Sequence, residues 1–149
     1  MISNNVEINK QAMLSEHFTL GEMTKTSYHT ADGNIPSRVA IENLINLREN
    51  WLEDLRFRAN QPIVINSGYR SAEVNRLCGG ATNSNHLTGC AVDIHCAGME
   101  QAIRYACILL DIADGKKMDF DELILEKRGT TIWVHFAVRP RGNRRYVDF

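Results

Sequence analysis

The sequence lacks an excess of charge of one sign and any long hydrophobic run. Its 149 residues carry a formal net charge of −1, which gives no overall attraction for nucleic acid or an anionic membrane. Residues 1–5 contain no apolar segment, so we expect neither a secretory signal nor a membrane span. We therefore expect the chain to be cytoplasmic as synthesised, with any target outside the cytoplasm reached through release by another protein.

The sequence also lacks a Cys-x-x-Cys pair, so its four cysteines form no recognisable zinc or redox motif. Without a signal peptide, free thiols are expected rather than disulfides. Cys90 and Cys96 fall on the apolar face of a predicted strand, and we interpret them as small buried hydrophobic residues. A structural zinc site built from these two cysteines and His86 is the alternative. The strand alternation argues against it, because Cys90 faces away from Asp93.

Hydrophobic periodicity predicts a single domain of mixed helices and strands, and the chain is long enough to bury a core. Apolar residues at intervals of three and four predict amphipathic helices, and β-branched or alternating runs predict strands. We interpret residues 1–17 as a lead-in and residues 139–149 as a basic tail. The predicted helices cover residues 36–58, a short segment after Ser71, and 98–112. The predicted strands cover residues 62–66, 90–95, 120–126 and 131–138, the last two joined by a hairpin loop at 127–130.

Two histidines and one aspartate have a spacing that suits a metal site. Residues 84–93 read Ser-x-His-x-x-Gly-x-Ala-x-Asp, and Trp-x-His follows at residues 133–135. His86, Asp93 and His135 offer two imidazoles and a carboxylate, a ligand set with which a catalytic zinc ion keeps a fourth position for water. Gly89 allows the chain to turn from the polar loop around His86 into the strand that carries Asp93. On spacing alone, a surface histidine or a hydrogen-bonded core histidine is the commoner outcome.

Three motifs in this order resemble the zinc D-alanyl-D-alanine carboxypeptidase family. They are Ser-Gly-Tyr-Arg at residues 67–70, the segment 84–93, and Trp-Val-His at residues 133–135. This family includes cell-wall carboxypeptidases, vancomycin-resistance dipeptidases and phage endolysin peptidases, and it is grouped with lysostaphin-type enzymes and the Hedgehog domain. The resemblance covers roughly residues 18–136. It implies an α+β fold, with a small antiparallel sheet flanked by helices, and one zinc ion bound by His86, Asp93 and His135.

The resemblance also implies contacts with a substrate. Arg70 is expected to face the substrate, where a planar guanidinium binds a carboxylate or a polarised carbonyl. The alternative for Arg70 is a surface ion pair with Glu73 or another carboxylate. Ser84 is expected to bond the substrate or to orient the ligand loop, and an ordinary turn residue is an equal alternative. Trp133 is a further candidate for substrate binding.

The candidate general base departs from the family pattern. Many family members have a carboxylate three residues before the last histidine, whereas this sequence has Ile132, which cannot transfer a proton. The run at residues 120–126 is similar to one in the Hedgehog domain, and that similarity implies Glu126 as the base.

Strand parity gives Glu122 as a reserve base. A four-residue hairpin loop would place Glu126 opposite Thr131 and Glu122 opposite His135. Both glutamates would then share the face of His135. The alternative for either glutamate is a solvated charge on a strand.

His95 and the arginines of the tail each have two possible interpretations. His95 shares the face of Asp93 and could contact the ligands or the pocket, although a surface imidazole is favoured. The tail arginines could bind an anionic wall polymer or nucleic acid, although a solvated tail is favoured. These arginines are residues 139, 141, 144 and 145.

Taken with the resemblance, these residues lead us to expect a zinc peptidase that hydrolyses peptidoglycan stem peptides. It would be a D,D- or L,D-carboxypeptidase or endopeptidase, and its lack of a signal peptide fits a phage or prophage lysis enzyme. We expect a monomer with a peptide substrate, one Zn²⁺, and no nucleic-acid or membrane partner. One alternative is a zinc-bearing module that binds wall peptides or a protein without cleaving them. A nucleic-acid binder that uses the tail is disfavoured by the net charge.

Overall fold

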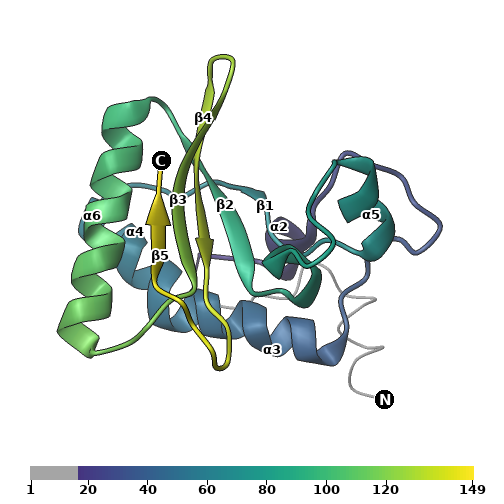
Figure 1. The fold of residues 1–149 in the computed structure, drawn as a ribbon, viewed down its shortest axis with the longest axis horizontal. Helices are drawn as coiled ribbons and strands as arrows, with labels where there is room; N and C mark the ends of the chain where they lie inside the picture. The colour runs from purple at the N-terminus through teal and green to yellow at the C-terminus, as the bar shows by residue number, and fades with distance from the viewer. Residues whose placement is uncertain (1–16) are drawn as a thin grey trace.

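The computed structural model describes residues 17–149, so nearly all of the expected lead-in lies outside the described residues. A five-stranded sheet in the order β1-β2-β4-β3-β5 forms the centre of the fold (Figure 1). Neighbouring strands are antiparallel, except that β5 runs parallel to β3. The α+β architecture with a small, mostly antiparallel sheet is therefore confirmed. The strands are β1 (Ile65–Ser67), β2 (Ala91–Cys96), β3 (Glu122–Arg128), β4 (Thr131–Ala137) and β5 (Tyr146–Asp148).

The three predicted helices are present, with changes at their ends, and two short helical segments, Leu20–Thr24 and Asn85–Thr88, form where no helix was predicted. The first long helix runs from Arg38 to Ala59 through a π-helical turn, and Ser37 caps it by accepting a hydrogen bond from the Ala40 amide at 3.1 Å. Helix α6 continues beyond residue 112, where its predicted range ends, to Lys116, and the capping residue Lys117 has a φ of 54°. The helical segments are α2 (Leu20–Thr24), α3 (Arg38–Leu47), η1 (Arg48–Leu52), α4 (Glu53–Ala59), α5 (Ala72–Leu77), η2 (Asn85–Thr88) and α6 (Met99–Lys116).

The two faces of the sheet have different roles. Val92, Val134 and Phe136 are fully buried on the face that packs against α6 and the π-helical turn, where Trp51 contacts Phe136 at 5.0 Å between ring centroids. Because side chains alternate along a strand, Asp93 and His135 point to the opposite face. Figure 1 shows α6 on one side of the sheet and α5 on the other. The apolar face thus provides the core, and the other face is free to carry a polar site.

The β3–β4 hairpin has a shorter loop than predicted. Its turn consists of Gly129 and Thr130, and Gly129 has a φ of 61°. Strand β3 therefore continues through residue 128. Glu126 therefore pairs with Trp133 and Ile124 pairs with His135, and the predicted register is wrong by two residues. A shift of two residues preserves the alternation. For that reason the prediction that Glu126 shares the face of His135 is nonetheless correct.

The C-terminal segment is mostly exposed, in line with the favoured interpretation of a solvated tail, but it is also attached to the fold. It adds β5 to the edge of the sheet, and three of its arginines form ion pairs. The side chain of Asp121 is fully buried and accepts hydrogen bonds from Arg144, with Arg139 at 3.3 Å. These ion pairs could not be predicted because the acidic partners lie far away in the sequence, where periodicity gives no signal.

The cysteines agree with the expectation from the sequence. All four cysteines are unpaired, and Cys90 and Cys96 are buried as predicted. Among residues 17–149, no helix has both the length and the apolar character needed to cross a bilayer.

Candidate metal centre

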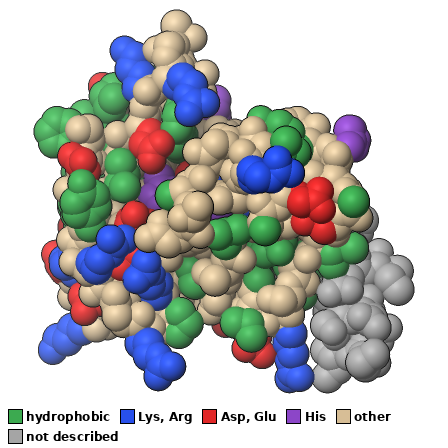
Figure 2. Space-filling model, turned by 45° about the vertical axis from the view of Figure 1, so that its right-hand side comes forward, with side chains coloured by type: hydrophobic (Ala, Val, Ile, Leu, Met, Phe, Trp, Pro, Cys, Tyr) green, Lys and Arg blue, Asp and Glu red, His purple; other side chains and the backbone are tan. Residues whose placement is uncertain are grey.

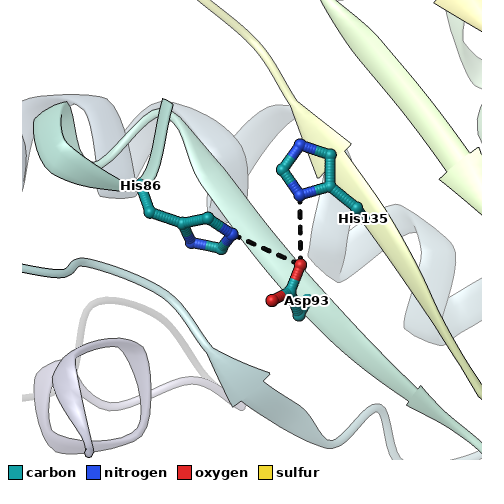
Figure 3. Close-up of side chains that lie close together, drawn as sticks. All are labelled: His86, Asp93 and His135. Atoms are coloured by element: carbon teal, nitrogen blue, oxygen red, sulfur yellow. Dashed lines mark hydrogen bonds and ion pairs between the residues drawn. The ribbon is translucent and has the colours of Figure 1, made fainter. Parts of the chain in front are cut away.

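His86, Asp93 and His135 meet in a buried cluster on the polar face of the sheet (Figure 3). One potential ligand atom from each residue lies within 4.8 Å of the other two. His86 comes from the short helix η2, whereas Asp93 and His135 lie directly opposite each other on β2 and β4. The three motif residues identified in the sequence are therefore brought together by the fold.

The turn around η2 places His86 over β2. Ser84 caps η2 by accepting a hydrogen bond from the His86 amide at 3.1 Å. Gly89 then reverses the chain with a φ of 73°, and a Cβ atom there would lie 2.3 Å from the Ala40 carbonyl oxygen. Only glycine suits both the positive φ and the close approach. The spacing between His86 and Asp93 thus reflects one helical turn followed by a tight reversal into the strand.

The His86 imidazole is oriented by the backbone. Its Nδ1 atom lies 2.7 Å from the Gly68 carbonyl oxygen, which can only accept a hydrogen bond, so Nδ1 carries the proton. With the proton on Nδ1, Nε2 is the nitrogen that faces the cluster, and it lies 3.3 Å from Oδ1 of Asp93. This is the tautomer that a histidine needs in order to coordinate a metal through Nε2.

His135 is oriented by a carboxylate instead. Its Nε2 atom lies 3.0 Å from Oε1 of Glu122, and its Nδ1 atom lies 3.1 Å from Oδ1 of Asp93. Burial would lower the pKa of His135, but the hydrogen bonds with Asp93 and Glu122 outweigh it and raise this pKa to about 9. Without a metal, the site therefore holds a proton at neutral pH. A bound cation would replace that proton and accept the lone pair of Nδ1.

Asp93 stays ionised in this environment. Burial opposes its ionisation, but the charge and hydrogen bonds of His86 and His135 prevail and keep the pKa of Asp93 well below its usual range. Its second oxygen accepts a hydrogen bond from Arg70 at 3.2 Å. Two neutral imidazole nitrogens and one carboxylate are a donor set that suits zinc, so the residues present fit the implied ion.

A cavity of about 390 Å³ opens over the cluster, and the other predicted site residues line it. Glu122 and Glu126 extend from β3, Trp133 from β4, and Arg70 and Ser84 from the loops around α5 and η2. His95 is exposed and is not among the lining residues, which agrees with the favoured interpretation of a surface imidazole. The remaining residues that line the cavity and bear on later arguments are Asn85, Arg139 and Arg144.

The two glutamates differ in their partners. Glu122 accepts hydrogen bonds from His135 and Asn85, and these bonds, against the effect of burial, keep the pKa of Glu122 below its usual value. Glu126 makes no hydrogen bond or ion pair with any residue between 17 and 149. Burial, helped by the charge of Asp93, raises the pKa of Glu126. A half-buried carboxyl with a raised pKa and free oxygens suits proton transfer better than one that is already bonded.

Arg70 is attached to the cluster rather than to the surface. Its Nη2 atom donates to Asp93, and its Nε atom donates to the Ser67 hydroxyl at 3.1 Å. The alternative ion pair with Glu73 is therefore not formed. Arg70 thus contacts Asp93, a candidate metal ligand, and also lines the cavity above the cluster.

Sequence reasoning missed Asn85, which connects the cluster to the C-terminal segment. Its Nδ2 atom donates to Asp121 at 2.8 Å and to Glu122 at 2.7 Å, and its Oδ1 atom accepts a hydrogen bond from Arg139 at 2.9 Å. Asn85 is buried although it lies in a polar loop. Its position between Ser84 and His86 is the only signal that the sequence offers for it.

The fold and the His-Asp-His cluster define a class of protein: a small α+β domain with a candidate metal site in an open cavity. Comparison with known proteins gives the family. Residues 16–125 match peptidase M15, and the chain belongs to this family of metallopeptidases. The match includes His86 and Asp93 but ends before His135, so the place of His135 in the site depends on the geometry.

A curated relative agrees with this assignment. The chain is 32% identical over 80 residues to the zinc D-Ala-D-Ala carboxypeptidase of Streptomyces albus G. The alignment covers 52% of this chain and 31% of that protein, so the chain spans about a third of the length of the relative. The similarity is distant, and it supports the expected family without showing the substrate.

Proposed function

We propose that this chain is a zinc-dependent peptidase that hydrolyses peptidoglycan stem peptides containing a D-amino acid. The observation that carries the proposal is the meeting of His86, Asp93 and His135 beneath a cavity that also contains the unbonded carboxyl of Glu126. Membership of peptidase M15 and the distant similarity to a zinc D-Ala-D-Ala carboxypeptidase support the chemistry and the substrate class.

The three cluster residues would hold the zinc ion through Nε2 of His86, a carboxylate oxygen of Asp93 and Nδ1 of His135. These are the atoms that point into the cluster, because the opposite nitrogens bond Gly68 and Glu122. A bound zinc ion supplies Lewis acidity and a water of lowered pKa.

Glu126 is the proposed general base. It takes a proton from the water that attacks the scissile carbonyl and passes this proton to the leaving amine. The raised pKa of Glu126 suits both halves of the task, since the carboxyl must accept the proton and then release it near neutral pH. Glu122 is the reserve candidate. Its bonds to His135 and Asn85 support a positioning role instead.

Arg70 is proposed to donate a hydrogen bond to the substrate. Its Nη2 is bonded to Asp93, while its Nη1 makes only a long contact of 3.5 Å with Asn75, which leaves an N–H group for a ligand. A donor at this position would stabilise the negative charge that develops on the scissile carbonyl oxygen. If Arg70 instead binds a terminal carboxylate, the chain acts as a carboxypeptidase. Ser84 and Trp133 line the same cavity and are proposed substrate contacts.

The test is a digest of purified peptidoglycan and its soluble stem peptides, analysed by mass spectrometry. We expect cleavage that stops with a chelator and returns with zinc. Release of a terminal D-residue identifies a carboxypeptidase, and internal cuts identify an endopeptidase. Stoichiometric zinc binding with no product from any wall type would favour the second candidate function, a zinc-bearing module that binds wall peptides.

The proposal extends to a phage or prophage lysis enzyme, on the resemblance of its motifs alone. Such an enzyme would be made in the cytoplasm and would reach the wall through a pore formed by another protein. We therefore expect lysis of a producing cell only when a pore-forming protein is made as well. Sedimentation should show a monomer.

A further inference from the structure

Arg139 lies between the metal cavity and a second, larger cavity. The second cavity has a volume of about 790 Å³ and lies between α3, η2 and the segment after β4, with Val39 and Pro140 among its lining residues. Arg139 lines both cavities, together with the η2 loop at residues 83–85. A peptide that extends from the cluster toward the second cavity would therefore pass this side chain.

The Arg139 guanidinium is fixed at one end. Its Nε atom donates to Oδ1 of Asn85 at 2.9 Å and lies 3.3 Å from Oδ2 of Asp121. Asn85 and Asp121 are both buried, so they hold the Nε end of the guanidinium in one orientation. Its two terminal nitrogens, Nη1 and Nη2, bond no residue in the described range. The side chain is 35% exposed, which leaves these nitrogens accessible to a ligand.

Two of the neighbouring arginines are already neutralised. Arg70 forms its ion pair with Asp93, and Arg144 forms ion pairs with both Asp121 and Glu122. Figure 2 shows acidic and basic side chains side by side around the hollow in which histidine atoms are visible. Arg139 thus differs from Arg70 and Arg144 because its terminal nitrogens, Nη1 and Nη2, have no acidic partner among the described residues.

We propose that Arg139 binds a carboxylate of the substrate on a residue close to the scissile bond. This inference rests on the proposed peptidase function and specifies its substrate class. Two coplanar N–H groups match the two oxygens of a carboxylate and form charge-assisted hydrogen bonds with them. A carboxamide at the same position presents one acceptor and a repelled N–H group. The preferred substrate is therefore an acidic peptide with that carboxyl group free, and amidation of the carboxyl group disfavours binding.

The experiment uses zinc-loaded protein and matched pairs of stem peptides. Each pair differs only in one carboxyl group, which is free in one member and amidated in the other. For one of these pairs, we expect the kcat/KM of the wild type to be about tenfold or more higher for the free acid than for the amide. A factor of this size corresponds to one hydrogen bond between charged groups. Arg139→Gln should bring this ratio close to one, mainly through KM, and Arg139→Lys should retain part of it.

Arg145→Gln is the matched control. Arg145 lies in the same segment and is 39% exposed, but it pairs with Asp114 and lines neither cavity. The preference for the acid should therefore survive in this variant. An equal loss for acid and amide in Arg139→Gln, together with weaker zinc binding, would show that Arg139 acts only through Asn85 and Glu122. The absence of any acid preference in the wild type would equally overturn the proposal.

A binding measurement separates this inference from the proposed function. Calorimetry with Glu126→Gln and the same peptide pairs reports affinity when no bond is cleaved. If the wild type cleaves nothing, but acid peptides bind more tightly than amides and Arg139→Gln removes the difference, the carboxylate site stands and the peptidase function falls. If cleavage occurs with no difference between acid and amide in either assay, the function stands and the role of Arg139 falls.

Discussion

Oε1 of Glu122 lies 3.0 Å from Nε2 of His135, on the side of the imidazole that faces away from Asp93. The contact joins two neighbouring strands of one hairpin, although the residues are not directly opposite in the register. It fixes the ring so that Nδ1 points to the cluster. A carboxylate in this position also makes the imidazole a stronger ligand, because it accepts the proton of the other nitrogen.

The first prediction concerns this contact. Glu122→Ala should weaken zinc binding by roughly 10- to 100-fold, the usual effect of removing a group that orients a metal-ligating histidine. Competition with a chromogenic chelator measures the affinity. Glu126→Ala makes the same change on the same strand face without touching His135, and it should bind zinc like the wild type. Equal zinc affinities in all three proteins would contradict the positioning role of Glu122.

The second prediction separates the two glutamates by activity. Glu126→Gln removes the proposed base but keeps the shape of the side chain, so kcat should fall by roughly 10² to 10⁴. Zinc content and melting temperature should stay near those of the wild type. The measurement is steady-state hydrolysis of a stem peptide at saturating zinc. If Glu126→Gln stays active and Glu122→Gln does not at full zinc occupancy, the base is Glu122.

The candidate metal ligands His86 and Asp93 could be proposed from the sequence because their signal is local. The alternation around Asp93 and the loop before Gly89 predict which residues face the site, and both are confirmed in the structure. The hairpin shows the limit of such reasoning. An error of two residues in the register leaves each side chain on the same face of the sheet. The face of Glu126 could therefore be predicted, whereas its partner Trp133 on the next strand could not.

The polar network beside the site could not be predicted. Asn85 contacts Asp121 and Arg139, which are 36 and 54 residues away in the sequence. No periodicity or spacing connects such residues, and each is an ordinary polar side chain by itself. Their contacts arise because β5 and the segment before it fold back onto β3 and η2. Tertiary packing of this kind decides which arginines are available to a ligand.

The third prediction concerns Arg70. Arg70→Lys keeps the charge beside Asp93 but loses the planar fork that contacts Ser67 and Asp93 together. We expect kcat/KM to fall by roughly 10²-fold, as for the loss of one donor to a developing oxyanion. Zinc affinity should fall much less. A loss of activity that merely parallels a loss of zinc would instead identify Arg70 as a support for Asp93.

The fourth prediction is a pH dependence of the metal-free protein. The folded-state pKa of His135 is about 9 and its ordinary value is 6.5, so the protonated ring favours the folded state. This contribution to stability is complete below pH 6.5 and is lost as the pH rises through 9. Calorimetric unfolding in the presence of a chelator should therefore show stability falling over this range relative to His135→Asn. With zinc bound, the effect should vanish, because the metal replaces the proton.

The fifth prediction tests the support provided by the C-terminal segment. Asp121 is fully buried, and burial alone would raise its pKa. Hydrogen bonds from Arg144 and Asn85 nevertheless lower this pKa to about 2. Its contribution to stability is present above its ordinary pKa of 3.8 and is lost as the pH falls through 2. At neutral pH, Asp121→Asn should lower the free energy of unfolding by about 3 kcal/mol, the lower end for breaking a buried ion pair, because Arg144 can rehydrate.

The matched control for this variant is Asp119→Asn. Asp119 is 68% exposed and lies 3.6 Å from Arg145, so its loss should change stability by less than about 0.5 kcal/mol. Denaturant titrations at pH 7 compare the two variants directly. Asp121→Asn should also weaken zinc binding, because Asn85 loses the carboxylate that helps to hold it against Glu122. A destabilised Asp121→Asn protein with full zinc affinity would mean that the C-terminal segment stabilises the fold without positioning the metal ligands.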